Sequence, residues 1–333
     1  MIVRYLSFFC FCFYSPNLIT LMGLSCIIAN VATLFYFSPD LGECPQWVYY
    51  TFAAGLFIYQ SLDAIDGKQA RRTGTSGPLG ELFDHCCDAL NTTLGTLTWA
   101  SATYLGQSWW TVASLCASLA NFYVSTWEEY HTGVLYLGYF SGPVEGVLML
   151  VGVHFISGVF GPAFWTLTGV EVFPMIDWST NAVARFFGGM QLNHVLIVIG
   201  GFVTISNTLM AIVNVLCVKF WPTELSRKDQ PVWKALAGLF PFINLCIWSA
   251  KWMSVWPDIV TDHLALFMLI LGLLFAHQVG IMILAHVTHL EFPLVDVPVT
   301  LIISSGYFLA SYEDTISQYV KRCVQIPNPK RGS

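Results

Sequence analysis

The sequence predicts an all-α fold, a polytopic bundle of membrane-spanning helices. Hydrophobic residues make up 56% of the 333 residues and charged residues only 10%, whereas about a quarter of the residues in a soluble domain are charged. Three long runs, 89–127, 186–218 and 263–290, contain no Asp, Glu, Lys or Arg. Since one span needs about 20 apolar residues, we expect about 8–10 transmembrane helices.

Turn-forming residues divide this apolar sequence into individual spans. Pro39-Asp40 follows the first span, and Gly106-Gln107-Ser108 breaks the first uncharged run. A stretch of Gly, Thr, Ser and Pro residues, 73–78, separates the second span from the third. Residues 162–189 contain Trp165 and Trp178 and are expected at the membrane surface, because Trp favours the headgroup level. In order, the predicted spans are 17–37, 47–64, 80–105, 108–128, 141–161, 190–218, 234–254, 260–288 and 293–311.

The basic residues orient these spans. Lys68, Arg71 and Arg72 lie in the expected connector 65–79, whereas the loop 38–46 has no Lys or Arg. Short loops rich in Lys and Arg face the cytosol, so the 65–79 connector is predicted to be cytosolic. Nine spans would place the basic C-terminal residues on the other side, so the number of spans and the side of the C-terminus stay open.

The ten cysteines do not predict disulfide bonds. Six of them fall in or beside predicted spans, and Cys44 lies in an expected loop. A disulfide framework belongs to small secreted domains, so these cysteines are interpreted as small apolar residues. The chain also has no basic patch of the kind that binds nucleic acid.

Four aspartates interrupt the second and third spans. Asp63, Asp66, Asp84 and Asp88 belong to the pattern D-x2-D-G-x2-A-R-x8-G-x3-D-x3-D. Residues three or four apart share a helix face, so two neighbouring helices can direct these carboxylates at a common centre. Carboxylates are costly in a membrane and mark functional sites there. Their natural partners are a pair of hard divalent cations, Mg²⁺ or Mn²⁺.

The other residues of the pattern suit chemistry at phosphorus. Gly67 and Gly80 allow a backbone or a phosphate to come close, and Arg71 offers a planar pair of donors for phosphate oxygens. Metal ions beside them would stabilise the attacking and leaving oxygens of a displacement. A purely structural ion-pair network is disfavoured, because four acids face three bases. A metal-gated transporter is a further alternative, but it predicts inverted repeats that are not visible in the sequence.

The pattern also carries a family resemblance. It is that of the CDP-alcohol phosphotransferases, and the segments PNLITLMG, PLGELFDHCCDALNTT and TWEEYHTGVLYLGYFSGPVEG resemble the eukaryotic cholinephosphotransferase and ethanolaminephosphotransferase branch. The resemblance is specific from Pro16 to about Gly161 and mainly hydropathic to about 290, and both ends of the chain look short for the branch. It divides the chain into an interfacial or truncated N-terminal segment (1–16), a catalytic membrane core (17–161), additional transmembrane helices (162–311) and a C-terminal tail (312–333).

This resemblance implies a transferase of phospholipid biosynthesis. The enzyme would pass phosphocholine or phosphoethanolamine from CDP-choline or CDP-ethanolamine to diacylglycerol and release CMP. It would work as a homodimer in the endoplasmic reticulum or Golgi, with its site facing the cytosol. The headgroup stays open, and another CDP-alcohol phosphatidyltransferase is the alternative. The implied metal ligands are Asp63, Asp66, Asp84 and Asp88, and the implied nucleotide and phosphate site comprises Asn17, Gly67, Ala70, Arg71 and Gly80.

Two residues are candidates for the general base. His85 adjoins Asp84 and shares a helix face with Asp88. A neutral imidazole can take the proton of the acceptor hydroxyl near neutral pH. In the wider family the last aspartate often has this role, whereas the resemblance to this branch favours His85.

Three residues further along the chain are candidates for binding the headgroup. Glu145, early in the fifth span, is an acid that needs a partner in the membrane. A carboxylate with aromatic walls suits a quaternary ammonium, although a favourable interaction with the helix dipole also explains this residue. Glu128 and Tyr130, at the end of the fourth span, are further candidates. Their neighbours Glu129 and His131 belong to the same group, and a solvated helix end is the alternative for all four.

Overall fold

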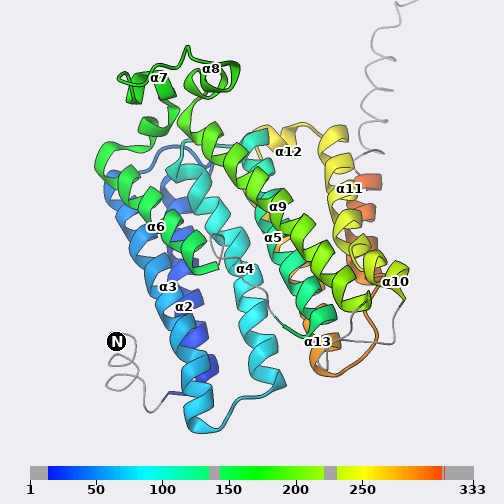
Figure 1. The fold of residues 1–333 in the computed structure, drawn as a ribbon. Coiled ribbons are helices and arrows are strands. Elements are labelled where there is room, and N and C mark those ends of the chain that lie inside the picture. The colour runs from blue at the N-terminus through cyan, green and yellow to red at the C-terminus, as the bar shows by residue number, and fades with distance from the viewer. Residues whose placement is uncertain (1–13, 135–142, 221–230, 310, 312–333) are drawn as a thin grey trace, which may run out of the picture.

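The computed structural model describes residues 14–134, 143–220, 231–309 and 311, and these ranges are mainly helical. Its long helices lie side by side in one bundle (Figure 1), which confirms the predicted all-helical fold. The elements are α2 (Pro16–Phe37), α3 (Gln46–Thr73), α4 (Pro78–Ala102), α5 (Trp109–Thr132), α6 (Pro143–Phe160), η1 (Pro162–Thr166), α7 (Gly169–Val172), α8 (Ala182–Gly188), α9 (Leu192–Phe220), α10 (Val232–Ala237), α11 (Phe240–Val255), α12 (Asp258–Thr261) and α13 (Leu264–Val287), followed by a helix at Val297–Leu309.

The bundle has the dimensions of a membrane domain. Four described segments are long and apolar enough to cross a bilayer: α2, α9, Val232–Val255 and α13. Two shorter apolar helices, Val144–Phe160 and Val297–Leu309, accompany them. Helices α3, α4 and α5, with 28, 25 and 24 residues, are as long but more polar. The protein is therefore a polytopic integral membrane protein.

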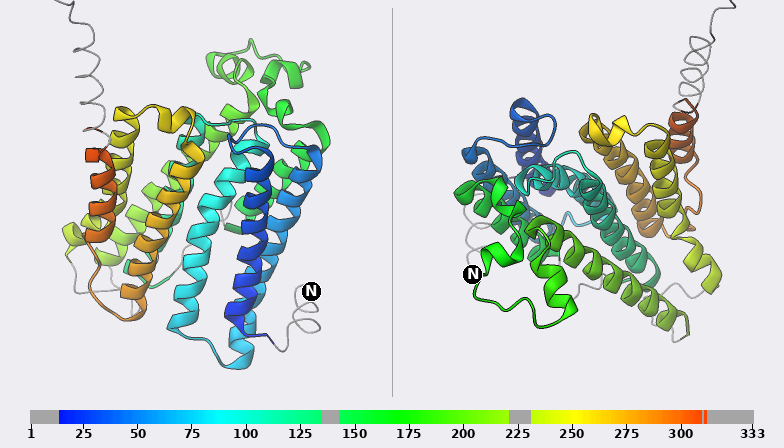
Figure 2. Two further views of the ribbon diagram at one scale, coloured as in Figure 1. Left: turned by 180° about the vertical axis from the view of Figure 1, so that it is seen from behind. Right: turned by 90° about the horizontal axis from the view of Figure 1, so that it is seen from above.

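The two ends of the bundle differ in character. The start of α2 and the connector between α3 and α4 lie at one end, which we call the site end. The short helices α7, α8 and α12 lie at the opposite end (Figures 1 and 2). Residues 162–189, expected at a membrane surface, form η1, α7, α8 and their connections there. The predicted segment 1–16 and tail 312–333 fall almost wholly outside the described residues.

The boundary between α3 and α4 corrects the prediction. Helix α3 continues to Thr73 instead of ending near residue 64, so the basic residues assigned to a connector are helical. Their charge indicated a loop, but Gln, Ala and Arg are good helix formers. The helix ends at Gly74, whose φ of 68° is a left-handed conformation that glycine adopts without strain. Helix α4 then starts at Pro78, which suits a first helical turn.

Two other predicted spans are interrupted. The seventh, 234–254, is divided between α10 and α11, with a break at 238–239, and the eighth, 260–288, begins as the separate short helix α12. Tyr123 and Trp127 of α5 pack against the first break. The Tyr123 hydroxyl donates to the carbonyl of Gly238 at 2.8 Å, and the Trp127 ring N–H donates to that of Ala235 at 2.9 Å. Tertiary hydrogen bonds thus take up carbonyls that a continuous helix would have used.

Close contacts among α2, α3 and α4 shape the site end. Helix α2 packs along both α3 and α4, and α4 packs along α13. Gly23 of α2 makes room for the ring of Tyr59 on α3, because a Cβ atom at Gly23 would lie 3.2 Å from Tyr59 Cδ2. Tyr59 is consequently buried in a cluster with Leu24 and Ile27. This contact holds the α3 turn just before the first aspartate pair against α2.

Candidate active site

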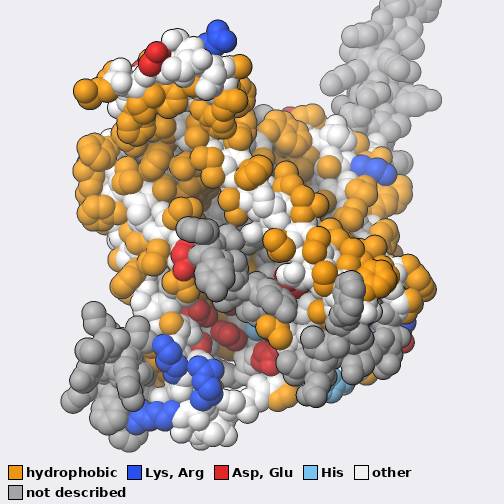
Figure 3. All heavy atoms as spheres, in the orientation of Figure 1, with side chains coloured by type: hydrophobic (Ala, Val, Ile, Leu, Met, Phe, Trp, Pro, Cys, Tyr) orange, Lys and Arg blue, Asp and Glu red, His pale blue; other side chains and the backbone are white. Residues whose placement is uncertain are grey.

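Three of the four predicted aspartates converge where α3 and α4 face each other. Carboxylate oxygens of Asp63 and Asp66 on α3 and of Asp84 on α4 all lie within 4.8 Å of one another. Asp66 is buried, and the other two are half-buried. Figure 3 shows acidic side chains gathered in a hollow near the site end, beside a group of basic side chains. The residue spacing predicted shared helix faces, and the short α3–α4 turn directs the two faces at one another.

The chemistry of this cluster fits a divalent cation. Asp84 Oδ1 is buried and has no hydrogen-bond partner among the described residues. Burying a carboxylate oxygen without a partner is unfavourable, and two further carboxylates of like charge lie beside it. A hard cation with a preference for oxygen ligands would balance both costs. The acidic cluster is therefore consistent with metal binding.

The fourth aspartate, Asp88, lies one turn further along α4. Its Oδ1 accepts a hydrogen bond from the hydroxyl of Tyr59. Neutral donors also contact two members of the cluster: Gln60 Nε2 donates to Asp63 Oδ2 at 3.0 Å, and the Thr20 hydroxyl donates to Asp66 Oδ2. No local sequence pattern marks these donors, since Thr20 belongs to another helix and Tyr59 resembles an ordinary core residue.

The candidate base His85 lies between a backbone carbonyl and an acid. Its Nδ1 lies 3.0 Å from the carbonyl oxygen of Glu81, and its Nε2 lies 3.7 Å from Glu129 Oε2. An N–H at Nδ1 donating to that carbonyl leaves Nε2 as the basic nitrogen. The sequence indicates Glu129 only as one of the residues at the end of α5 that could border a headgroup pocket, and it does not indicate Glu129 as the partner of His85.

The predicted nucleotide residues gather at the same end. The side chain of Arg71 lies alongside Gly67, since a Cβ at that glycine would be 3.8 Å from Arg71 Nη1. Asn17, in the first turn of α2, faces Gly80 in the first turn of α4, with Asn17 Oδ1 3.7 Å from the corresponding Cβ position. Arg71 is exposed, and Ala70 beside it is half-buried. These residues border the acidic cluster on its solvent side.

The three headgroup candidates have different surroundings. Glu145, in the first turn of α6, is exposed. Glu128 is buried and accepts a hydrogen bond from Asn214 Nδ2 at 2.7 Å. Tyr130 is buried, and its hydroxyl donates to the carbonyl of Leu290 at 2.8 Å. The end of α5 is therefore packed against α9 and the segment after α13 and is not a solvated helix end.

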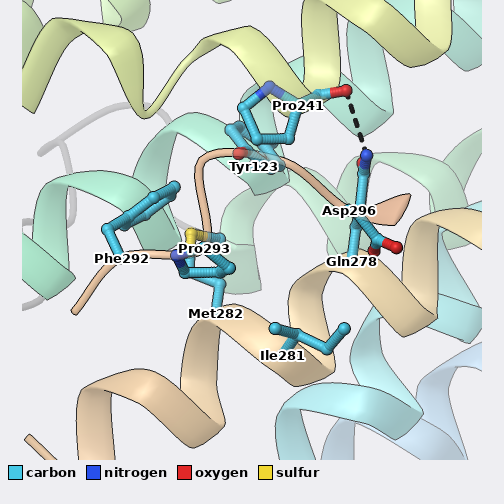
Figure 4. Close-up of a pocket in the computed structure, with 8 residues that line it drawn as sticks. All are labelled: Tyr123, Pro241, Gln278, Ile281, Met282, Phe292, Pro293 and Asp296. Carbon is cyan, nitrogen blue, oxygen red and sulfur yellow. Dashed lines mark hydrogen bonds between the residues drawn. The ribbon is translucent and has the colours of Figure 1, made fainter. Parts of the chain in front are cut away.

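A small cavity elsewhere in the bundle does not have the size of a substrate site. It measures about 10 Å³ and lies among α5, α11, α13 and the segment at 292–296 (Figure 4). Gln278 Nε2 donates to the carbonyl of Pro241 at 3.0 Å at its edge. Asp296 Oδ1 accepts from the backbone N–H of Val299 at 3.1 Å and caps the last described helix. A space of this size suits about one water molecule.

The fold and the cluster together define a helical membrane protein with a carboxylate site of the kind that binds divalent cations. Residues 13–166 match the family described as CDP-alcohol phosphatidyltransferase. The chain is 39% identical over 291 residues to cholinephosphotransferase 1 of Saccharomyces cerevisiae, covering 85% of this chain and 71% of that protein. It is 36% identical over 293 residues to choline/ethanolaminephosphotransferase 1 of the same yeast, with coverage of 85% and 71%.

A plant protein is similar to this chain over a comparable length. Choline/ethanolaminephosphotransferase 2 of Arabidopsis thaliana is 34% identical over 278 residues, which are 81% of this chain and 67% of the plant protein. The chain belongs to the CDP-alcohol phosphatidyltransferase family. It is accordingly a CDP-alcohol phosphotransferase, an enzyme of phospholipid biosynthesis, and the resemblance seen in the sequence is confirmed.

The unpartnered oxygen of Asp84 generates a prediction about stability. Asp84→Asn keeps the shape of the side chain but removes one of three clustered charges. We expect it to stabilise the metal-free protein by about 1–4 kcal/mol, the repulsion between like charges about 4 Å apart at a dielectric constant between those of water and a protein surface. Thermal unfolding in EDTA measures this difference. Added Mg²⁺ should raise the melting temperature of the wild type and have little effect on the variant.

Asp40→Asn is the matched control for this measurement. Asp40 lies in the α2–α3 loop at the opposite end and accepts a hydrogen bond from the Ser38 hydroxyl at 2.7 Å. This variant should show the same Mg²⁺-dependent rise as the wild type. A metal-free Asp84→Asn protein less stable than wild type would contradict the idea that the cluster is under electrostatic strain.

Proposed function

We propose that this enzyme transfers phosphocholine, phosphoethanolamine or both from the CDP-alcohol to diacylglycerol. The products are CMP and phosphatidylcholine or phosphatidylethanolamine. The proposal is supported by the names of the aligned yeast and plant relatives, which are choline- and ethanolaminephosphotransferases. The observation that carries it is the acidic cluster with a histidine next to Asp84, in a bundle of membrane-spanning helices.

In this proposal the four aspartates hold two divalent ions, Mg²⁺ or Mn²⁺. Asp63, Asp66 and Asp84 supply the converging oxygens, and Asp88 completes the set from the next turn of α4. When bound, the ions would neutralise the pyrophosphate and the charge that develops on the leaving CMP. The buried, unpartnered oxygen of Asp84 supports this assignment more directly than the sequence pattern does.

The residues at the solvent side of the cluster orient the nucleotide. Arg71 is always charged and can bind two phosphate oxygens with its planar guanidinium group. Gly67, Ala70 and Gly80 leave space for the phosphates and the cytidine to approach the helices, and Asn17 offers an amide next to Gly80. Together these groups hold the CDP-alcohol with its β-phosphorus directed at the acidic cluster.

His85 accepts the proton of the acceptor hydroxyl in this proposal. With its Nδ1–H directed at the Glu81 carbonyl, Nε2 presents its lone pair to the lipid hydroxyl. Glu129 Oε2, 3.7 Å from the same nitrogen, then stabilises the positive charge of the imidazolium that forms. Asp88 is the alternative base. Its Oδ1 already accepts from Tyr59, which leaves one oxygen for a metal or a proton.

Glu145 is the favoured residue for neutralising the ammonium of the headgroup. Its carboxylate is exposed at the start of α6, whereas Glu128 and Tyr130 are engaged by Asn214 and Leu290. An ammonium held by one carboxylate does not discriminate strongly between choline and ethanolamine. We therefore propose that both CDP-alcohols are used, with CDP-choline used at least as well as CDP-ethanolamine.

A reconstituted assay tests the substrate assignment. The full-length protein in liposomes with diacylglycerol and Mg²⁺ should convert CDP-choline, CDP-ethanolamine or both to the corresponding phospholipid and CMP. EDTA should abolish turnover, and Mg²⁺ or Mn²⁺ should restore it. In the same assay Glu145→Gln should raise KM for the CDP-alcohol by roughly tenfold, since a hydrogen bond to a charged group is worth about 1.5–3 kcal/mol. Activity only with CDP-diacylglycerol and a free alcohol would instead assign another family reaction.

If His85 is the general base, replacing it should lower the catalytic rate without weakening nucleotide binding. His85→Ala should lower kcat by about 10²–10⁴-fold, the usual contribution of a general base. Nucleotide affinity should change little, because Arg71 and the aspartates are untouched. Glu129→Gln should lower kcat less and shift its pH dependence. If His85→Ala retains the wild-type rate between pH 6 and 8, the base is Asp88.

We also propose that the site end faces the cytosol of endoplasmic reticulum or Golgi membranes, in a homodimer. Lys68, Arg71 and Arg72 lie at this end, whereas α8 contributes Arg185 at the other, in keeping with the positive-inside rule. The homodimer and the organelle rest on the resemblance alone.

Cysteine labelling tests the orientation. A single cysteine at Thr75, in a cysteine-depleted background, should react with an impermeant thiol reagent from the cytosolic face of sealed microsomes. Reaction only from the lumenal face would reverse the orientation. Cross-linking in the same microsomes should trap a dimer, and recovery of monomer alone would refute it.

A further inference from the structure

Two buried hydroxyl groups from different helices contact the predicted metal ligands. Tyr59 is 3% exposed, and its hydroxyl donates to Asp88 Oδ1. Thr20 is 4% exposed, and its hydroxyl donates to Asp66 Oδ2. The Thr20 oxygen also lies 3.2 Å from the carbonyl of Pro16, but it is closer to Asp66, so its single proton is assigned to the carboxylate. Each hydroxyl therefore occupies one oxygen of a carboxylate.

The surrounding packing holds both donors in place. The Tyr59 ring lies against Gly23 of α2 and in a cluster with Leu24, Ile27 and Cys87. Thr20 is a β-branched residue with few rotamers in a helix, and it lies one turn before Gly23 on the same helix. Neither hydroxyl can turn away from its aspartate without disturbing the contact between α2 and α3.

The bonding pattern divides the aspartates into two kinds. Asp88 has one oxygen bonded to a neutral hydroxyl and accepts no other hydrogen bond among the described residues. Asp66 has Oδ2 bonded to the Thr20 hydroxyl and Oδ1 bonded to the backbone N–H of Gly67, so neutral donors hold both of its oxygens. Asp84 has a buried oxygen with no partner among the described residues. A neutral donor orients a carboxylate without cancelling its charge, whereas Lys or Arg in the same place would compete with a cation. Donors of this kind next to metal ligands tune metal affinity in other proteins.

From this pattern we infer that Tyr59 and Thr20 are positioning residues that set the divalent-cation affinity of the site. Their hydroxyls fix the orientation of the Asp88 and Asp66 carboxylates, so that the remaining lone pairs of these groups are held in a constant direction for the metal. The inference rests on the proposed metal site. It adds that helix α2, which carries no aspartate of the pattern, takes part in metal binding through Thr20 and through the Gly23–Tyr59 contact.

Direct metal binding tests the inference without relying on turnover. Full-length protein in nanodiscs is titrated with Mn²⁺, and the free ion is followed by its electron paramagnetic resonance signal. Tyr59→Phe and Thr20→Val keep the shape of each side chain and remove its hydroxyl. Each should weaken Mn²⁺ binding by roughly tenfold or more, the usual effect of losing such a partner. Saturating Mn²⁺ should restore most of the wild-type kcat, because the defect lies in the affinity for the metal.

Two matched variants control for loss of a hydroxyl elsewhere on the same helices. Tyr49 on α3 is also buried, and its hydroxyl accepts the backbone N–H of Cys44 at 2.8 Å, at the opposite end of the bundle. Thr33 on α2 donates only to the Ala29 carbonyl of its own helix, at 2.8 Å. Tyr49→Phe and Thr33→Val should bind Mn²⁺ with wild-type affinity.

The outcomes separate this inference from the proposed function. A wild-type protein that fails to bind Mn²⁺ would remove the metal site and the inference with it. A wild type that binds, together with Tyr59→Phe and Thr20→Val proteins of unchanged affinity, would overturn the inference alone. If one of these two variants fails to fold, the Mn²⁺ affinity of the other variant tests the inference. Equal weakening by the control variants would show that general loosening of the bundle, and not positioning, is responsible.

Discussion

The repulsion among carboxylates held close together inside a membrane bundle is the constraint on which this structure depends. Asp63, Asp66 and Asp84 bring oxygens within 4.8 Å of one another, and no Lys or Arg among the described residues forms a salt bridge with them. Such an arrangement is unfavourable by itself. The arrangement persists because the packing of the surrounding helices fixes the positions of the aspartates. A bound cation would offset the repulsion between their carboxylates.

Three contacts impose that arrangement. The left-handed Gly74 and Pro78 make the turn between α3 and α4 short, so the two aspartate-bearing faces meet. Gly23 lets α2 approach α3 closely enough for Tyr59 to be buried beneath the site. Helix α4 is held from its other side by α13. The energy that offsets the electrostatic cost therefore comes from apolar packing some distance away, as is common for functional sites.

Helix α5 connects the acidic cluster to the second half of the bundle. Glu129 approaches His85, while its neighbour Glu128 is bonded to Asn214 on α9. Trp127, one residue earlier, donates to the break between α10 and α11. The last turns of α5 are thus fixed by three separate elements. Helices beyond the family-matched region 13–166 thus hold the helix that carries Glu129, although they contribute no aspartate.

The sequence by itself determined the fold class, the family and the residues most suited to chemistry. Composition and uncharged runs are averages over many residues, so they predict a helical membrane bundle without knowledge of contacts. The aspartate pattern is local, and its spacing of three and four residues predicts shared helix faces. The sequence did not determine every helix boundary. The charged end of α3 has the composition of a connector, and charge alone does not show that a helix continues.

Only the tertiary structure decided which distant side chains complete the site. Glu129 is 44 positions after His85 in the chain, and Thr20 is 46 before Asp66. Nothing in their local sequence indicates these partners. Tyr130 and Glu128 looked equivalent to Glu129 as residues at a helix end, but rotation of about 100° per residue around α5 directs each to a different neighbour. That direction is set by how α5 packs against α4, α9 and α13. This packing cannot be inferred from a local sequence pattern.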